Sequence, residues 1–503
     1  WWGHRIPAWY DDQGNYVVAR NQDAALEKFR IQDSKFSGEI RQDEDVLDTW
    51  FSSWLWPMSV FDGIQNPDGE DINYFYPTND LVTGPDIIFF WVARMIMSGY
   101  EYRHQEPFRN VYFTGIIRDQ YGRKMSKQLG NSPDPLGLIG RYGADGVRTG
   151  LLFSSPAGND LIFDTPVPKS NDPAEIARFQ QENDVLASKL CEQGRNFNNK
   201  IWNAFRLIKG LSPAPSEGGE IFSPPPSGEA GRGLPVAWFE ARFNQKMAET
   251  EELFANYQIS DALLTVYKLA WDDFCSWYLE MIKPEPGQPI DAETYQATVR
   301  LFDNLLRVLH PFMPFITEEI WQQLEPRAEG DSLCVAAYPQ PQPFDSQIIA
   351  DCAAAQEVVS QVRNIRNNRG ISPKTPLPLF VRTQNQALYN RFGALIAKLA
   401  NVSQLSFTTD KVEGAVGFIV GTDEFFVTLE QEIDVAAETE KTQQELDYQR
   451  GFRESQVKKL GNEKFVSNAK PEIVENERKK LADSEAKIKA LEERLADLTG
   501  RRA

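Results

Sequence analysis

The chain has 503 residues, of which 41% are hydrophobic, and this length is sufficient for about three or four domains. Its net charge of −19 argues against bulk electrostatic attraction to nucleic acid, but it leaves room for an RNA partner that docks on local basic patches. No uncharged apolar run of about 20 residues occurs, so we expect no membrane span. The four cysteines form no Cys-x-x-Cys pair, which predicts no disulfide framework and no protein-bound metal, and indicates a reducing compartment such as the cytoplasm.

The first two regions of the chain differ in character. Residues 1–170 are rich in Trp, Phe, Tyr and Ile, and their strand-like runs and glycine turns predict an α/β domain. Residues 171–375 show helical periodicity with short connections, which favours an antiparallel helical bundle. The helices are predicted at Asn183–Leu211, Ala237–Tyr257, Ile259–Ile282, Asp291–Leu309, Met313–Leu324 and Gln347–Arg369. Residues 212–235 are dense in Pro, Gly, Ser and Glu, which predicts a disordered insertion.

Two further regions follow. Residues 376–435 alternate apolar and polar side chains, which predicts a small α/β unit. In residues 436–503, apolar side chains recur every seven positions, and this spacing predicts a helical hairpin closed as an antiparallel coiled coil. The seam residues are Val474, Leu481, Ile488 and Leu495, with Leu491 and Leu498 on the alternate positions. From Ala437 onward the chain carries 15 basic and 14 acidic residues, a net of +1, so the preceding part carries −20.

A loop with two lysines is the strongest chemical signal in the sequence. Lys124 and Lys127 follow a predicted buried strand at residues 111–117 and precede a helix that starts at Asp134-Pro135. The lysines therefore lie at the edge of a sheet, where α/β folds bind ligands. Ammonium groups there can offset the charge that builds up on phosphate during nucleotidyl transfer. Taken alone, a Lys-x-x-Lys pair is more often a solvated basic loop.

The segment around these lysines, KMSKQLGN at residues 124–131, resembles the lysine signature of the class I aminoacyl-tRNA synthetases. Gln128 stands where that family usually has serine, which we expect to alter only local hydrogen bonding. Other segments resemble the valyl branch of the family. They are DVLDTWFSS at 45–53, LVTGPDIIFFW at 81–91, HPFMPFITEEIW at 310–321, much of which related synthetases share, and LGNEKFVSNAKP at 460–471. The segment WGHRIPAWY at 2–10 resembles the point where the class I catalytic fold resumes after its inserted editing domain.

The resemblance implies a fold and an organisation. It implies a Rossmann-like catalytic half-domain with the lysine loop over residues 1–170, then an anticodon-binding helical bundle, a small α/β unit and a coiled-coil tRNA-binding arm. The family's His-Ile-Gly-His signature is not formed by the three histidines, and no region resembles its editing domain. We therefore expect a C-terminal half that is inactive in isolation, needs an N-terminal half as partner, and is monomeric when complete.

The implied activity is the ligation of valine to its tRNA. Valine's carboxylate would attack the α-phosphate of Mg²⁺-bound ATP, and the tRNA's terminal ribose would then accept the acyl group. The resemblance places Lys127, supported by Lys124, on the triphosphate, and Met125 and Ser126 beside the adenine. Gly84 and Asp86 match the family's Gly-x-Asp element near the ATP ribose or the substrate ammonium, although Asp86 is equally well explained as a helix cap.

The valine pocket and the tRNA contacts are assigned in the same way. Trp50, Ile87 and Trp91 resemble the pocket walls, although buried aromatic residues more often belong to a core. Three arginines spaced by three residues, and six basic residues near the predicted hairpin turn, are candidates for contacts with tRNA, the alternative being a solvated charged face. These residues are Arg363, Arg366 and Arg369, and Lys458, Lys459, Lys464, Arg478, Lys479 and Lys480.

Several alternatives remain open from the sequence. The specificity could be isoleucyl or leucyl, although the isoleucyl relative is expected to end in a cysteine-rich zinc module. The chain could also be a tRNA-binding module without catalysis, or a coiled-coil interaction protein on an inert α/β domain. Both loop lysines, the Gly-x-Asp element and the aromatic pocket residues favour the ligase. The varied, non-repeating residues 1–436 argue against the coiled-coil protein.

Overall fold

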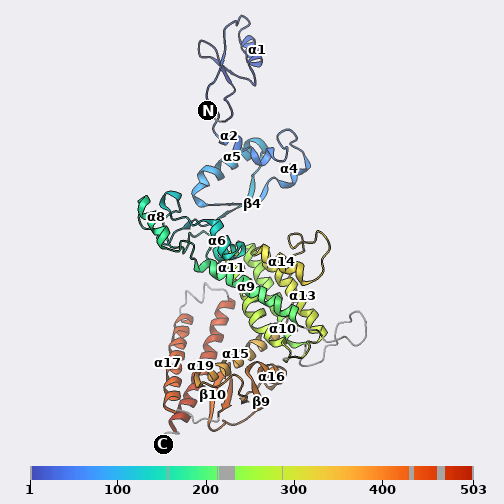
Figure 1. The fold of residues 1–503 in the computed structure, drawn as a ribbon, viewed down its shortest axis with the longest axis vertical. Coiled ribbons are helices and arrows are strands. Elements are labelled where there is room, and N and C mark those ends of the chain that lie inside the picture. The colour runs from blue at the N-terminus through green and yellow to red at the C-terminus, as the bar shows by residue number, and fades with distance from the viewer. Residues whose placement is uncertain are drawn as a thin grey trace. The chain divides into compact units, whose positions relative to one another are not determined.

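The computed structural model describes residues 3–155, 158–211, 213, 233–285, 287–429, 435–461 and 471–500 (Figure 1). The chain divides into two compact units. The first unit comprises Trp1–Ser132 and Ser154–Asn183, and the second comprises Pro133–Phe153 and Asp184–Ala503. Most of the predicted insertion at 212–235 lies outside the described residues.

The first unit begins with a small antiparallel sheet. Strands β1 (Ala8–Tyr10), β2 (Tyr16–Val18) and β3 (Arg41–Gln42) pair in the order β2-β1-β3. Helix α1 (Gln22–Gln32) starts at Asn21, whose side chain accepts a hydrogen bond from the Ala24 amide, and helix α1 buries Ala25 and Phe29. An N-cap of this kind satisfies a backbone donor that the first helical turn leaves free.

The rest of the first unit contains two pairs of parallel strands. Strand β4 (Thr78–Thr83) pairs with β5 (Phe108–Phe113), and β6 (Ile117–Arg118) pairs with β7 (Leu161–Ile162). The helices are α2 (Trp50–Ser53), α3 (Trp56–Ser59), α4 (Glu70–Phe75), α5 (Ala93–Arg103) and α8 (Pro173–Glu182). A 3-10 turn at Pro85–Ile87 and a π-helical turn at Ile88–Val92 lead from β4 into α5.

The prediction of one continuous strand over residues 111–117 was wrong. Strand β5 ends at Phe113, and the chain resumes pairing only at Ile117. Between them, the Ile116 amide donates to the Asp160 carboxylate, and β6 then pairs with β7 instead of β4. The apolar residues of 111–117 therefore belong to two different strand pairs, β4–β5 and β6–β7.

The second unit is built mainly from helices. They are α6 (Pro135–Tyr142), α7 (Ala144–Phe153), α9 (Lys189–Gly210), α10 (Leu234–Ala255), α11 (Ile259–Lys268), α12 (Leu279–Ile282), α13 (Ala292–Leu309), α14 (Pro314–Leu324) and α15 (Ser346–Arg369). A π-helical segment at Leu269–Tyr278 joins α11 to α12. The predicted helix from Asn183 begins only at Lys189, because the Ser188 hydroxyl caps it by accepting from the Cys191 amide.

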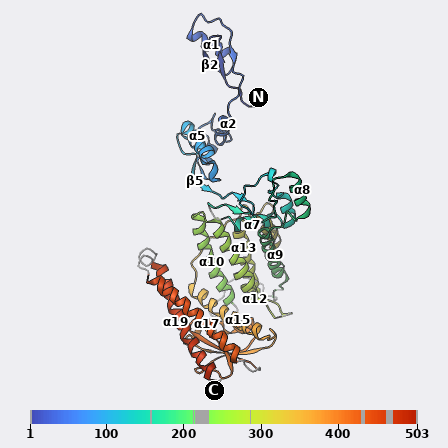
Figure 2. The ribbon, with the colours of Figure 1, turned by 90° about the vertical axis from the view of Figure 1, so that its left-hand side faces the viewer.

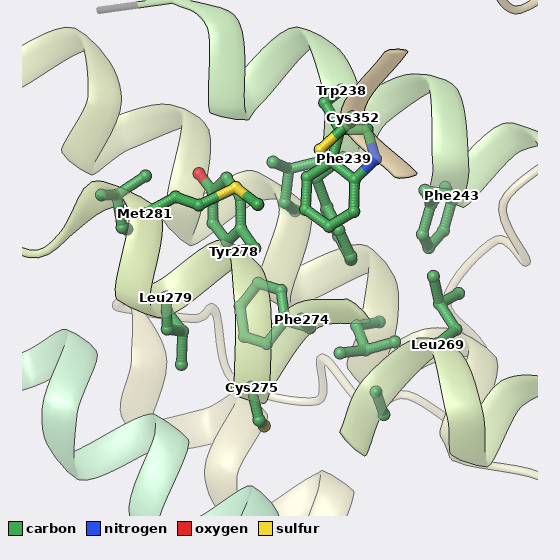
Figure 3. Packing of buried hydrophobic residues seen from close by; sticks show 14 of the residues in the cluster. Trp238, Phe239, Phe243, Leu269, Phe274, Cys275, Tyr278, Leu279, Met281 and Cys352 are labelled. Atoms are coloured by element: carbon green, nitrogen blue, oxygen red, sulfur yellow. The ribbon is translucent and has the colours of Figure 1, made fainter. Parts of the chain in front are cut away.

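An aromatic cluster fills the centre of these helices (Figure 3). Phe239, Phe274 and Tyr278 are fully buried, and their ring centroids lie between 5.1 and 5.3 Å apart. The Tyr278 hydroxyl lies 2.7 Å from the Thr298 hydroxyl, so its polar end is satisfied within the core. Removing one such ring would cost about 3–5 kcal/mol, since the lost burial is accompanied by a cavity.

A four-stranded sheet follows α15. Strands β8 (Leu377–Arg382), β9 (Val402–Phe407), β10 (Ala415–Val420) and β11 (Asp423–Thr428) are arranged in the order β10-β11-β8-β9. Helix α16 (Gln386–Ala400) connects the parallel strands β8 and β9. Alternate residues of β8 and β10 are buried, which is the pattern of strands with one face on a core.

The last two helices, α17 (Val435–Leu460) and α19 (Pro471–Gly500), lie side by side (Figures 1 and 2). Arg450 pairs with Glu492 at 2.6 Å and Arg453 with Glu485 at 3.1 Å, so the helices run antiparallel. Of the predicted seam residues, Val474 and Leu491 are buried, whereas Leu481, Ile488 and Leu495 are half-buried. Glu477 and Ser484 occupy the same seven-residue register as Leu491 and are also buried. Within the described residues, no helix is long and apolar enough to cross a membrane.

Candidate active site and nucleic-acid contacts

The candidate active site lies where β4 and β5 end. Thr83 pairs with Phe113, so both parallel strands finish at the same edge of the sheet. This edge is where α/β folds commonly bind ligands. Gly84 and Asp86 follow β4, and the Asp86 carboxylate lies 3.8 Å from the Lys124 ammonium of the lysine loop. The structure therefore brings together the Gly-x-Asp element and one of the two predicted lysines.

Gly84 lies close to the Asp86 and Ile116 side chains. A Cβ atom at residue 84 would lie 2.8 Å from the Asp86 carboxylate and 3.2 Å from the Ile116 side chain. Asp86 lies inside the 3-10 turn, and neither that turn nor the described π-helical turn after it has a side-chain cap. The structure therefore gives no support to Asp86 as a helix cap and leaves its carboxylate half exposed beside Lys124.

The lysine loop is held by a fully buried asparagine. The Asn131 side chain accepts a hydrogen bond from the Ser126 amide at 2.8 Å and donates to the Lys124 carbonyl at 3.2 Å. It also donates to the Asp119 carboxylate at 2.9 Å. One amide group therefore fixes the backbone on both sides of Met125, and satisfied buried networks of this kind rigidify the segment that they hold.

Asp119 extends this network. Its carboxylate accepts from the Tyr121 and Arg123 amides and from the Arg123 guanidinium, whose nitrogens also donate to the Pro168 and Lys169 carbonyls. Burial alone would raise the pKa of Asp119, but the hydrogen bonds from Asn131, Arg123 and Tyr121 hold it below the usual value. The base of the loop is thus a hydrogen-bonded centre built around the Asp119 carboxylate, which accepts from Tyr121, Arg123 and Asn131.

The outer part of the loop leaves its charged groups in solvent. Lys127 is exposed, and the Lys124 side chain is 72% exposed, so both ammonium groups can reach a phosphate. Gln128 is exposed, and its backbone N–H donates to the Ser126 hydroxyl. Gly130 has a φ of 59°, and a Cβ there would lie 2.4 Å from the Ile176 side chain. The predicted Asp134 cap is confirmed, since its carboxylate accepts from the Leu136 and Gly137 amides.

Two of the three predicted pocket residues are in contact. The rings of Trp50 and Trp91 lie 4.2 Å apart between centroids, and the Arg94 guanidinium lies 4.4 Å from the centre of the Trp50 ring. Ile87 is half-buried on the turn before Trp91. Nearby Phe89 is 85% exposed, which is a large apolar area to leave in water.

The three arginines of α15 have different environments, and the prediction for Arg366 was wrong. Arg366 is 3% exposed, and its guanidinium donates to the carbonyls of four residues. The four are Ser372, Thr375, Ala400 and Asn401. It therefore joins the end of α15 to the sheet and has no face for a phosphate. Arg363 is exposed, although it donates to the Leu399 carbonyl, and Arg369 is half-buried.

The basic residues of the last two helices are mostly exposed. Lys458, Arg478 and Lys479 lie on the surface, whereas Lys459 and Lys480 share the buried Glu477 carboxylate at 3.2 and 2.9 Å. These two hydrogen-bonded lysines hold the pKa of Glu477 below its usual value. The candidate Lys464 lies outside the described residues.

Three family models match the chain. Residues 1–164 match the tRNA synthetases of class I (I, L, M and V), and residues 237–381 match the anticodon-binding domain of tRNA ligases. Residues 434–499 match the valyl-tRNA synthetase tRNA-binding arm. The valine–tRNA ligase of Parabacteroides distasonis is 54% identical over 99% of this chain. The chain belongs to the valyl-tRNA synthetase family.

Other valyl-tRNA synthetases show the same extent of similarity. The valine–tRNA ligases of Bacteroides thetaiotaomicron and Chlorobaculum tepidum are 50% and 37% identical, each over 99% of this chain. The chain spans about half the length of these relatives, 53% and 54% respectively. A solved LeuRS-tRNA-LeuAMS complex of Agrobacterium radiobacter K84 aligns with a TM-score of 0.46 at 17% identity, covering 69% of this chain and 41% of that one.

In this valyl-tRNA synthetase family member, three residues of the candidate site were not predicted from the sequence. Asn131 belongs to the quoted lysine segment, but only its complete burial shows that it organises the loop. Asp119 carried no motif, and its role depends on contacts with residues 121–131. Arg94 could have been found, because it lies three positions after Trp91, and residues at that spacing share a face wherever the chain is helical. Among the described residues, no cluster of three or more His, Cys, Asp or Glu side chains could hold a metal ion.

Proposed function

We propose that this chain provides the lysine-loop part of the active site and the tRNA-binding regions of a valine–tRNA ligase. The observation that carries the proposal is the buried Asn131–Asp119 centre, which presents Lys124 beside Asp86 and leaves Lys127 exposed. A basic loop that is merely solvated does not need a buried hydrogen-bond network to fix its backbone. The matches to valine–tRNA ligases over 99% of the chain support the same substrate class.

The proposed chemistry rests on positioning and charge. Valine's carboxylate attacks the α-phosphorus of ATP, an oxygen–phosphorus bond forms, and pyrophosphate leaves with the electron pair of the broken bond. Lys127, with Lys124 in support, would stabilise the negative charge on the triphosphate and the leaving pyrophosphate. Met125 and Ser126 would pack beside the adenine. Mg²⁺ would enter with ATP, because this cation is usually held by substrate phosphates.

Gly84 and Asp86 are proposed to face the ATP ribose or the valine ammonium. Asp86 already lies 3.8 Å from one cation, Lys124, in the ligand-free protein. When the lysine moves onto a phosphate, the carboxylate becomes free to accept from a hydroxyl or an ammonium group. Trp50, Ile87 and Trp91 are proposed as the walls of the valine pocket, with Arg94 fixing the Trp50 ring by a cation–π contact.

The second unit is proposed to bind tRNA through two regions. Helices α9 to α15 would form the anticodon-binding bundle, with Arg363 and Arg369 as phosphate contacts in place of the three arginines first considered. Helices α17 and α19 would act as a two-stranded coiled-coil arm. Its exposed Lys458, Arg478 and Lys479, with Lys459, Lys464 and Lys480, would contact the tRNA backbone without reading its sequence.

The catalytic part of the proposal can be tested by restoring full length. The segment of the Parabacteroides distasonis relative that precedes the matched region would be joined to this chain, and valine-dependent pyrophosphate exchange would be measured. We expect exchange in the fusion, and we expect Lys127→Ala to lower its rate by about 10²–10³, as for other lost contacts to a developing charge. Lys35→Ala removes an exposed lysine elsewhere in the first unit and should leave the rate unchanged.

The alternatives are outcomes of this experiment. Near-normal exchange by the Lys127→Ala fusion would remove the lysine loop from the mechanism. A folded fusion that binds tRNA but exchanges no pyrophosphate would favour a tRNA-binding module without catalysis. Exchange with isoleucine or leucine in preference to valine would assign the other specificities.

A further inference from the structure

The four cysteines of the chain differ sharply in accessibility. Cys191 and Cys352 are completely buried and Cys275 is 8% exposed, and Cys275 and Cys352 lie within the apolar core (Figure 3). Burial raises the pKa of the Cys275 thiol to about 12, so it stays protonated and inert at neutral pH. Cys334 is exposed on the segment between α14 and α15.

Cys334 is not isolated, because its sulfur lies 3.5 Å from His310 Nε2. The other ring nitrogen, Nδ1, lies 2.8 Å from the Thr317 hydroxyl. That hydroxyl donates its proton to the Met313 carbonyl at 2.7 Å, so toward His310 it can only accept. Nδ1 therefore carries the ring proton, and Nε2 presents a lone pair to the Cys334 thiol. Cys334, His310 and Thr317 therefore have the arrangement of a nucleophile, a base and a group that orients the base.

The turn that carries Cys334 is anchored in front of the imidazole. The Leu333 amide and the Ser332 hydroxyl both donate to the Glu318 carboxylate, at 2.8 and 3.1 Å. The Ser332 hydroxyl in turn accepts from the Cys334 amide at 3.1 Å. Since Glu318 belongs to the helix that carries Thr317, one element positions both the thiol and its base.

The charged groups around His310 favour proton acceptance during reaction. Burial lowers the pKa of His310, so the ring is neutral and able to accept a proton at neutral pH. Asp145 and Glu318 are the carboxylates that face it, and both stabilise an imidazolium once formed. The Arg148 guanidinium donates to the carbonyls of Pro311 and Phe312, the two residues that follow His310.

We propose that Cys334 is a modification site, a surface thiol that His310 activates toward soft electrophiles. In the reaction with a haloacetamide, the sulfur forms a bond to the carbon that bears the halogen, and the carbon–halogen bond breaks with loss of halide. The thiol proton passes to His310 Nε2 and then to water, so atoms and charge balance. Among the four thiols, only Cys334 has both access and a base.

The test uses the full chain as it exists, treated with iodoacetamide at neutral pH and followed by peptide mass spectrometry. We expect Cys334 to be carboxamidomethylated well before the other three cysteines. We expect His310→Gln to slow this labelling by roughly tenfold or more at pH 7, in line with the loss of a general base. The difference should shrink near pH 9, because a free thiol ionises without help at about pH 8.5.

Two controls keep the test decisive. Cys334→Ser should abolish the fast labelling. The buried cysteines report on folding, since their rapid labelling in His310→Gln would mean that this variant has unfolded. In that case the pH profile of the unaltered chain decides. Fast labelling of Cys334 that persists well below pH 8.5 would support His310 as its base. A labelling rate that rises only as an ordinary thiol ionises, near pH 8.5, would overturn the proposal. If Cys334 is labelled at pH 7 as fast in the folded His310→Gln variant as in the unaltered chain, the proposal is also overturned.

Discussion

At the scale of single residues, the lysine loop depends on a side chain that never meets solvent. Asn131 is completely buried, and its three hydrogen bonds fix the Lys124 and Ser126 backbone to Asp119. Losing a buried hydrogen-bond partner costs about 1–3 kcal/mol. The loop should therefore open more often when Asn131 is replaced, while the rest of the unit stays folded.

Limited proteolysis with trypsin measures this directly, because Lys124 and Lys127 are themselves cleavage sites. We predict that Asn131→Ala raises the rate of cleavage after these lysines by roughly five- to thirtyfold, the factor that corresponds to about 1–2 kcal/mol. Gln128→Ala changes an exposed side chain of the same loop and should leave the rate unchanged. Equal cleavage of the Asn131→Ala variant and the parent chain would show that Asn131 does not hold the loop.

The Asp119 carboxylate at the base of the lysine loop makes the stability of the fold dependent on pH. Hydrogen bonds from Asn131, Arg123 and Tyr121 outweigh burial and hold the pKa of Asp119 below its usual value. A group with a depressed native pKa stabilises the fold above its unfolded pKa, about 3.9, and loses that contribution as the pH falls through the native pKa. We predict that Asp119→Asn has a lower urea midpoint than the parent chain at pH 7, and that the gap narrows toward pH 3.5. A constant gap would contradict this assignment.

The sequence displays the charged residues of the candidate site but not the residues that hold them in place. Lys124 and Lys127 are displayed by a local segment, and the Asp134 cap is a local pattern, so both could be recognised from neighbouring residues. Asn131 and Asp119 are twelve residues apart and meet only in the folded chain. A spacing of three along α15 placed three arginines near one face, but it could not show that Arg366 faces the protein interior.

At the scale of elements, Arg366 fixes the end of α15 to the four-stranded sheet. Its guanidinium satisfies the carbonyls of Ser372, Thr375, Ala400 and Asn401, which lie before and after β8 and α16. Removing it leaves these acceptors without a buried charged donor. The contact therefore stabilises the fold and contributes nothing to a phosphate site.

We predict that Arg366→Ala lowers the free energy of unfolding of the second unit by at least about 3 kcal/mol, since hydrogen bonds to a charged group are each worth about 1.5–3 kcal/mol. Asn367→Ala, an exposed neighbour on the same helix, serves as the matched control. Thermal unfolding followed by circular dichroism compares the two variants. A small loss in Arg366→Ala, similar to that of the control, would show that the four carbonyls find other partners.

The helical elements were more predictable than the strands. The sequence predicted the last two helices, but the heptad spacing of the second one did not reveal that Glu477 and Ser484 are buried in the register of Leu491. Glu477 is tolerated there because Lys459 and Lys480 pair with it. The strand at residues 111–117 was mispredicted because its apolar run cannot show where the chain changes pairing partner.

At the scale of the whole molecule, charge is distributed unevenly. The chain carries −19 overall, yet its residues from Ala437 onward carry +1. We predict that the double variant Lys458→Ala and Lys479→Ala weakens binding of valine and isoleucine tRNAs by the same factor and reduces the slope of affinity against salt by about 1–2, as expected for lost phosphate contacts. Filter binding over a salt series gives both quantities. An unequal effect on the two tRNAs would show that the arm reads sequence.

The most direct test of the account is equilibrium binding of this chain to valine tRNA and isoleucine tRNA at two salt concentrations. We predict a clear preference for valine tRNA that persists at the higher salt, because specific contacts depend less on counter-ion release than backbone contacts do. Equal binding of both tRNAs that fades with salt would contradict it, since only the charged arm would then be binding.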